Sequence, residues 1–65
     1  MNRMRRERGR KGLTQAELAE RAGVGVNTVI RMEQGDARRA HVKTLWRVAR
    51  ALDVDVEDLM EKEGA

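Results

Sequence analysis

Two short apolar repeats, separated by a glycine, are the clearest pattern along the chain. The apolar positions of the two repeats are Leu18, Ala19, Ala22, Val29 and Met32. Spacing of three and four residues places side chains on one face of an α-helix. The pattern therefore predicts one helix over about residues 15–22 and another over about 26–34, with Gly23 in the turn between them.

The residues around the first of these helices support its predicted start and end. Thr14 with Glu17 three residues later forms a capping box, in which the hydroxyl and the carboxylate each accept a backbone N–H. Gly23 stands where the chain needs a left-handed residue after the helix. Two helices joined this tightly cross steeply and leave the second prominent on the surface, a geometry that fits a DNA major groove.

Two registers are open for a helix that precedes this pair. The preferred one predicts a helix over about residues 2–8 that ends at Gly9, so that residues 10–12 become a basic insertion before the next helix. Counting back from Gly12 instead would place Glu7 at an inward position and Gly9 inside the helix, both unfavourable choices. The apolar pair of the preferred helix is Met1 and Met4.

The second half of the chain predicts two further helices after a loop over residues 35–40. One spans about 42–52 and ends before Asp53 in a left-handed position, and Asp55 caps a short one over about 56–62. Their inward residues are Leu45, Val48, Ala49, Leu52 and Leu59. We therefore expect an all-α fold, a compact five-helix bundle with residues 1–65 as a single domain.

At these residues the chain resembles the Cro/C1-type (phage-repressor, XRE) helix-turn-helix family. The matching residues are Gly12, Leu13, Thr14, Gln15, Glu17, Leu18, Ala19, Ala22, Gly23, Val24, Thr28, Glu33 and Gly35. The resemblance implies a lambda-repressor-like DNA-binding domain. It further implies a transcriptional regulator, expected to be a repressor that binds a palindromic operator as a homodimer.

Composition narrows the classes of function that we expect of this chain. The chain has no cysteine and one histidine, which leaves no thiolate metal site and few candidates for catalysis. We expect neither an enzyme nor a cofactor. No apolar stretch approaches the ~18 residues of a membrane span, and no signal peptide is visible, so a cytoplasmic location is the default expectation.

Charge is distributed unevenly along the chain. Residues 1–12 hold six Arg or Lys against one Glu, whereas residues 51–65 hold six Asp or Glu against Lys62. A basic face opposite an acidic end orients a molecule on a polyanion. Solvated surface charge is the plainer interpretation, but together with the helix-turn-helix pattern the distribution favours double-stranded DNA as partner.

Four residues on the outward face of the second helix of the pair are candidates for reading bases. They are Val26, Asn27, Ile30 and Arg31. The planar fork of Arg31 matches O6 and N7 of guanine, Asn27 can pair with adenine, and an apolar side chain can contact a thymine methyl. The alternatives are that Arg31 meets only a phosphate and that Ile30 belongs to the core.

A second group is expected at the DNA backbone. Gln15 starts a helix whose amides and dipole favour a phosphate, and the resemblance gives the matching Gln that role. The other expected phosphate contacts are Arg10, Lys11, Thr28, Arg38, Arg39, His41 and Lys43. Thr28 is also expected to be half-buried and structural.

Three further expectations concern structure and partners. The resemblance pairs Glu33 with an arginine of the first helix, which is Arg5 in the preferred register and Arg8 in the other. Trp46 either fills the core edge or anchors a dimer, whose expected surface comprises Trp46, Val54, Val56 and Met60. The homodimer is expected to form on DNA if not in free solution. Other open possibilities are an antitoxin with a protein partner and an interaction module that no longer binds DNA.

Overall fold

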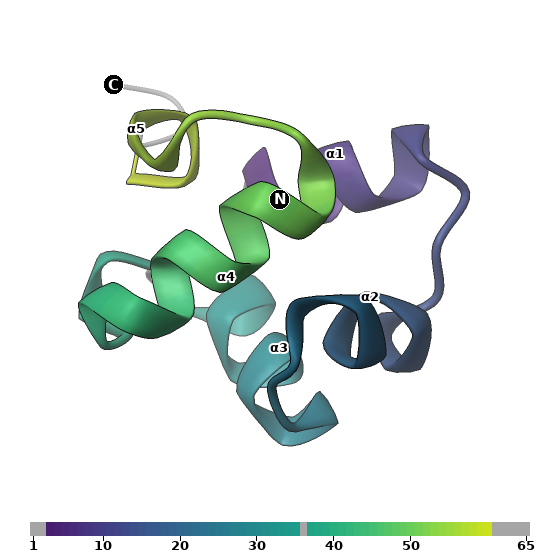
Figure 1. Cartoon of the computed structure of the whole chain (residues 1–65), viewed down its shortest axis with the longest axis horizontal. Coiled ribbons are helices and arrows are strands. Elements are labelled where there is room, and N and C mark those ends of the chain that lie inside the picture. Colours follow the sequence, from purple (N-terminus) through teal and green to yellow (C-terminus); the bar gives the residue numbers. More distant parts are fainter. Residues whose placement is uncertain (1–2, 36, 61–65) are drawn as a thin grey trace.

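The computed structural model describes residues 3–35 and 37–60, and within these ranges the chain forms five α-helices and no strand (Figure 1). The elements in chain order are α1 (Arg3–Arg10), α2 (Gln15–Ala22), α3 (Val26–Gln34), the 3-10 helix η1 (Ala37–Arg39), α4 (Val42–Leu52) and α5 (Val56–Met60). None of these helices is long and apolar enough to cross a membrane.

A single apolar core holds the helices together. Its members are Met4, Leu13, Leu18, Ala19, Ala22, Val29, Met32, Ala37, Leu45, Val48, Ala49, Leu52 and Leu59. The helix α4 contacts both α2 and α5, and α2 also packs against α3 (Figure 1). The inward positions predicted for the described helices are therefore confirmed, whereas Ala37, the first residue of η1, was not predicted.

The helix-turn-helix consists of α2 and α3, whose predicted bounds are confirmed. The capping box is present: the Thr14 hydroxyl accepts the Glu17 N–H at 3.0 Å, and the Glu17 carboxylate accepts the Thr14 N–H at 2.9 Å. Gly23 has φ 71°, in the left-handed region. By contrast, Gly25 begins α3 without any side-chain cap. A turn of three residues, from Gly23 to Gly25, therefore joins the two helices.

The prediction for the first helix was wrong in register. Within the described residues α1 runs to Arg10, so Gly9 lies inside it, and the left-handed glycine is Gly12 with φ 68°. The Leu13 N–H donates to the carbonyl of Arg8 at 3.2 Å, which closes the end of the helix. Burial of Leu13 just after this turn outweighs the ~1 kcal/mol that a helical glycine costs. The residues taken as an insertion are the last turn of α1 and its cap.

The last two helices, α4 and α5, follow the prediction more closely. The helix α4 has its predicted bounds, and Asp53 is left-handed with φ 56°. For α5, residues up to Met60 are described, and the predicted extension to Lys62 lies outside the described residues, as do Met1 and Asn2. At its start the Asp58 carboxylate accepts the Asp55 N–H at 3.3 Å.

Candidate nucleic-acid interface

The outward face of α3 carries the predicted base-reading residues. Val26, Asn27 and Arg31 are exposed, while Val29 and Met32 are buried beneath them. Ile30 is half-buried and does not belong to the core cluster. These four side chains therefore share one accessible face, as helical spacing predicts.

Sequence reasoning missed one residue of this face. Gln34 is exposed in the last turn of α3, seven residues after Asn27 and three after Arg31. That spacing continues the same helical face and was a readable signal. The amide of Gln34 gives the face a further donor and acceptor.

A hollow of about 410 Å³ lies along one side of α3, between that helix, η1 and the start of α4. Its lining includes Thr28, Arg31, Arg39 and His41, four residues predicted separately as DNA contacts. Arg31 and Arg39 are both exposed. Their charges lie at a concave surface beside the outward face of α3, where an anion can be held.

His41 is the N-cap of α4, a role that the sequence analysis did not foresee. Its Nδ1 accepts the N–H of Lys43 at 3.1 Å. Since an accepting Nδ1 carries no proton, the neutral ring has its proton on Nε2. That Nε2–H is the donor left for a group in the adjoining hollow, next to the N-terminus of an eleven-residue helix whose dipole favours an anion.

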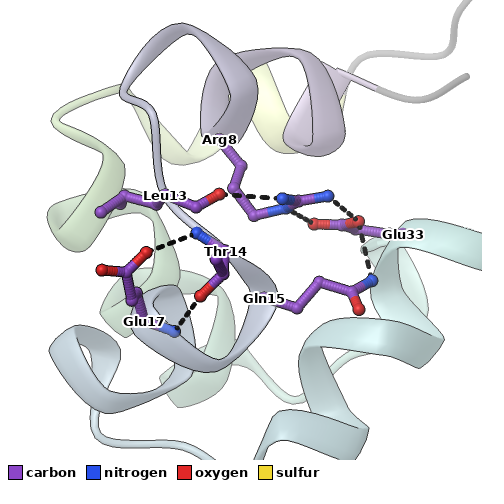
Figure 2. Close-up of polar contacts among 6 residues, drawn as sticks. All are labelled: Arg8, Leu13, Thr14, Gln15, Glu17 and Glu33. Carbon is purple, nitrogen blue, oxygen red and sulfur yellow. Dashed lines mark hydrogen bonds and ion pairs between the residues drawn. The ribbon is translucent and has the colours of Figure 1, made fainter.

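The other side of α3 is locked to α1 and α2 by a polar network around Glu33 (Figure 2). Arg8 donates from Nε to Glu33 Oε2 at 2.6 Å and from Nη2 to Oε1 at 3.0 Å. Its Nη1 donates to the carbonyl of Leu13 at 2.9 Å. The Glu33 side chain is only 4% exposed, so this two-pronged pair is largely shielded from water. The hydrogen bond to Glu33 raises the pKa of the Arg8 guanidinium.

The network also includes Gln15, whose Nε2 donates to Glu33 Oε1 at 3.2 Å (Figure 2). Gln15 is half-buried in the first turn of α2. Its side chain is thus held in place beside the helix N-terminus that was expected to face a phosphate. The phosphate contact itself stays a prediction.

The sequence analysis preferred Arg5 as the partner of Glu33, whereas the structure shows Arg8 in this role. The clamp is Arg8, the residue expected in the rejected register, because α1 extends beyond Gly9. Arg5 is nearby: it lines a second hollow of about 490 Å³ together with Arg8, Gln15, Glu33 and Gln34. This second hollow lies between α3, α1 and the start of α2, whereas the first lies between α3, η1 and α4, so α3 has a hollow lined by arginine on each flank.

The remaining predicted phosphate contacts have different positions. Arg10 and Lys11 are exposed at the end of α1, and Lys43 is exposed in the first turn of α4. Arg10 also lies 3.6 Å from the carboxylate of Glu7. Arg38 belongs to η1, and its side chain lies outside the described residues. Their DNA contacts stay predictions.

The residues expected at a dimer surface divide into two groups. Trp46 is 58% and Met60 40% exposed, so the alternative that Trp46 fills the core edge is wrong. Val54 and Val56 are half-buried against the core and offer little free surface. Val42, one turn before Trp46, is 63% exposed and was missed.

Comparisons with known proteins agree with this geometry. Residues 3–59 match a family described as helix-turn-helix. The chain is 40% identical over 65 residues to an uncharacterized HTH-type transcriptional regulator of Methanothermobacter thermautotrophicus, covering 95% of this chain and 93% of that protein. It is 33% identical over 57 residues to another of that description from Archaeoglobus fulgidus, covering 88% of this chain and 80% of that protein. No solved structure matches the chain.

Proposed function

The chain belongs to the Cro/C1-type helix-turn-helix family and is a DNA-binding transcription regulator, and from this premise we propose that it is a repressor acting as a homodimer on a palindromic operator. In the proposed complex α3 lies in the major groove, where Asn27 and Arg31 read base edges. Val26 and Ile30 add apolar contacts to thymine methyl groups.

One observation carries the proposal: the reading face of α3 is bordered by hollows on both flanks. The hollow toward α4 contains Arg31, Arg39 and His41, and the one toward α1 contains Gln15. A helix lying in the major groove has a phosphate strand on each side. Charged or polar groups on both flanks therefore fit the two strands, and their neutralisation of phosphates supplies affinity.

The homodimer part of the proposal follows from size. One helix-turn-helix unit covers few base pairs, and two-fold dimers with half-sites about one helical turn (~34–36 Å) apart are the common way to gain specificity. The exposed Trp46, Val42 and Met60 supply apolar area outside α3. Because only a few exposed apolar side chains are available, this surface fits a pairing that strengthens on DNA.

Selection of duplexes from a random pool by the purified chain tests the proposal. We expect enrichment of one inverted-repeat motif. A variant with Asn27 and Arg31 both replaced by Ala serves as control, because both residues are exposed and their loss leaves the core unchanged. This control should retain weak binding without enriching the motif. If the unaltered chain enriches nothing at any salt concentration, the fold serves as an interaction module instead.

A direct repeat or a single half-site as the enriched motif would contradict the two-fold dimer while leaving sequence-specific binding intact. Placing the enriched motif between a promoter and a reporter then tests repression. Expression that rises when the regulator is present would contradict the repressor assignment.

A further inference from the structure

A third hollow, of about 360 Å³, lies away from α3, between the last turn of α2 and the second half of α4. We call it the basic hollow, defined by Arg21, Arg47 and Arg50 in its lining. All three arginines are exposed, and within the described ranges none has a carboxylate within 4 Å. Arg47 Nη1 makes one long hydrogen bond to the Gly23 carbonyl, at 3.4 Å.

Directly after α4 the charge changes sign. Asp53, Asp55 and Glu57 form what we call the acidic corner, and all three are exposed. None of them has a Lys or Arg nitrogen within 4 Å in the part of the chain that the structure describes. The neighbouring Asp58 differs, because its Oδ1 lies 3.9 Å from Arg3 Nη2.

Asp53 is an unfavourable residue for the isolated fold. It is the one described non-glycine residue with a positive φ, at 56°, a region that costs about 1–2 kcal/mol for most side chains. Its carboxylate also lies at the C-terminus of α4, where the helix dipole disfavours negative charge. Glycine would relieve both effects. The stability of the monomer therefore does not explain an acidic residue at this position.

We propose that the acidic corner of one copy docks in the basic hollow of a second copy, and that both contacts form reciprocally in a two-fold dimer. This rests on the homodimer of the proposed function and specifies its interface. Arg50 and Asp53 are three residues apart at the same end of α4, so a two-fold axis passing between the two patches brings each patch against its opposite.

The exposed apolar side chains fit this arrangement. Trp46 lies one turn before Arg50 on α4 and is 58% exposed, so it can be covered where the charged patches meet. A dimer that packed the exposed faces of the two α4 helices directly together would bring Lys43, Arg47 and Arg50 against their own copies. That arrangement is opposed by like charges.

DNA is a poorer occupant of the basic hollow than a second copy. No residue of α3 lines this hollow, and the acidic corner beside it would repel a phosphate strand. Within the described ranges none of the three arginines has a carboxylate within 4 Å, although Arg21 interacts with Glu17 at longer range, and the acidic corner of a second copy would supply such carboxylates. Attraction between the patches is between exposed charges, so it weakens as salt is added.

Charge reversal tests the proposal. One variant carries Arg47→Glu and Arg50→Glu, and the other carries Asp55→Lys and Glu57→Lys. Each variant alone has two patches of the same sign, so sedimentation equilibrium at low salt should show its self-association weakened at least about tenfold against the unaltered chain. Mixed in equal amounts, the two variants should form a heterodimer, because each patch then meets its opposite.

Circular dichroism of each variant verifies that α-helix is retained. A variant with Arg10→Glu and Lys11→Glu makes the same charge change at exposed residues at the end of α1, outside both patches and away from α4, and without DNA it should dimerise like the unaltered chain. Asp53→Gly provides a second test: it should raise the unfolding temperature and at the same time weaken the dimer. Fluorescence of Trp46, the single tryptophan, follows dimerisation independently.

Two results would overturn the inference: reversed variants that each dimerise normally, or a mixture that stays monomeric although both variants are folded. An unaltered chain that stays monomeric at low salt would overturn it as well. DNA selection with the same protein is a separate measurement. Loss of the charge contact with intact motif enrichment would leave the proposed DNA binding standing, whereas loss of enrichment would remove the function itself.

Discussion

The two flanks of α3 differ in how their charges are used. On the flank toward α1, Arg8 and Gln15 donate hydrogen bonds to a Glu33 side chain that is almost fully buried (Figure 2). On the flank toward α4, Arg31 and Arg39 are exposed at a hollow. The first flank fixes the helix to the bundle, and the second leaves its charges exposed to solvent.

This difference separates stability from binding along one nine-residue helix. A buried charge must be paired within the fold, because desolvation of a lone charge costs several kcal/mol. An exposed arginine adds little to stability and is available to a phosphate. Substitutions on the two flanks should therefore produce different phenotypes, in unfolding on one side and in DNA binding on the other.

The largest effect is expected from Glu33→Ala on the locked flank. Removing one partner of a buried pair leaves the Arg8 guanidinium uncompensated and should destabilise the fold by about 3–5 kcal/mol. Urea unfolding followed by circular dichroism measures this loss. Glu20→Ala, at an exposed position of α2, is the matched control and should change stability by less than about 0.5 kcal/mol. Equal small losses in both variants would show that the network does not hold α3.

On the open flank, Arg39→Ala should leave unfolding almost unchanged and weaken binding to all DNA sequences alike. The plot of log affinity against log salt concentration should become shallower by about one unit, because one phosphate contact is lost. Measured on a single half-site, Arg50→Ala is the matched control: an exposed arginine outside the hollow, which should keep the original slope. An unchanged slope for Arg39→Ala would remove this residue from the phosphate contacts.

The starts of α2 and α3 allow the same comparison on a smaller scale. Thr14→Ala removes the capping box of α2 and should cost about 1 kcal/mol of unfolding free energy. Gly25→Ser gives α3 the missing cap and should add a few tenths of a kcal/mol. Gly25 has φ −74°, and a Cβ there would meet Thr28 Oγ1 at a comfortable 3.9 Å. A loss of stability in Gly25→Ser would contradict the assignment of this residue as an uncapped helix start.

The smallest expected effect is in the pH dependence of stability. Hydrogen bonds from the backbone N–H and side chain of Thr14 lower the pKa of Glu17 in the folded protein. The stabilisation from a lowered pKa is fully present above the pKa of glutamate in the unfolded chain, and it is lost as the pH falls through the folded value. The stability difference between the unaltered chain and Glu17→Gln should therefore shrink on acidification. A difference that grows toward low pH would contradict the capping geometry.

The sequence was sufficient for the helices whose ends carry local signals. Thr14 and Gly23 mark the start and end of α2, and Asp53 marks the end of α4, through their own local preferences. The bounds of α3 followed from the spacing of its apolar residues. The end of α1 was missed because two glycines compete there. The choice between Gly9 and Gly12 depends on where Leu13 is buried and where Arg8 meets Glu33, contacts between residues as far as 25 positions apart.

The candidate site likewise contains residues that local sequence signals predicted and residues that they did not. The exposed face of α3 follows from periodicity, so Asn27 and Arg31 were predictable and Gln34 could have been found. The hollow beside Arg39 and the cap at His41 were not predictable, since they depend on how η1 lies between α3 and α4. Exposure of Trp46 was left open for the same reason, because helical spacing gives it a position at the border of the inward face.

The most direct test of the account is a panel of duplexes, each differing at one base pair from the selected motif, measured with the unaltered chain, Arg31→Ala and Arg39→Ala. We expect Arg31→Ala to lose about 1–3 kcal/mol of discrimination at a single base pair and to keep its preferences elsewhere. Arg39→Ala should weaken binding to every duplex by a similar factor. If both variants instead lose affinity uniformly across the panel, Arg31 contacts a phosphate. That result would contradict the claim that α3 reads a base through Arg31.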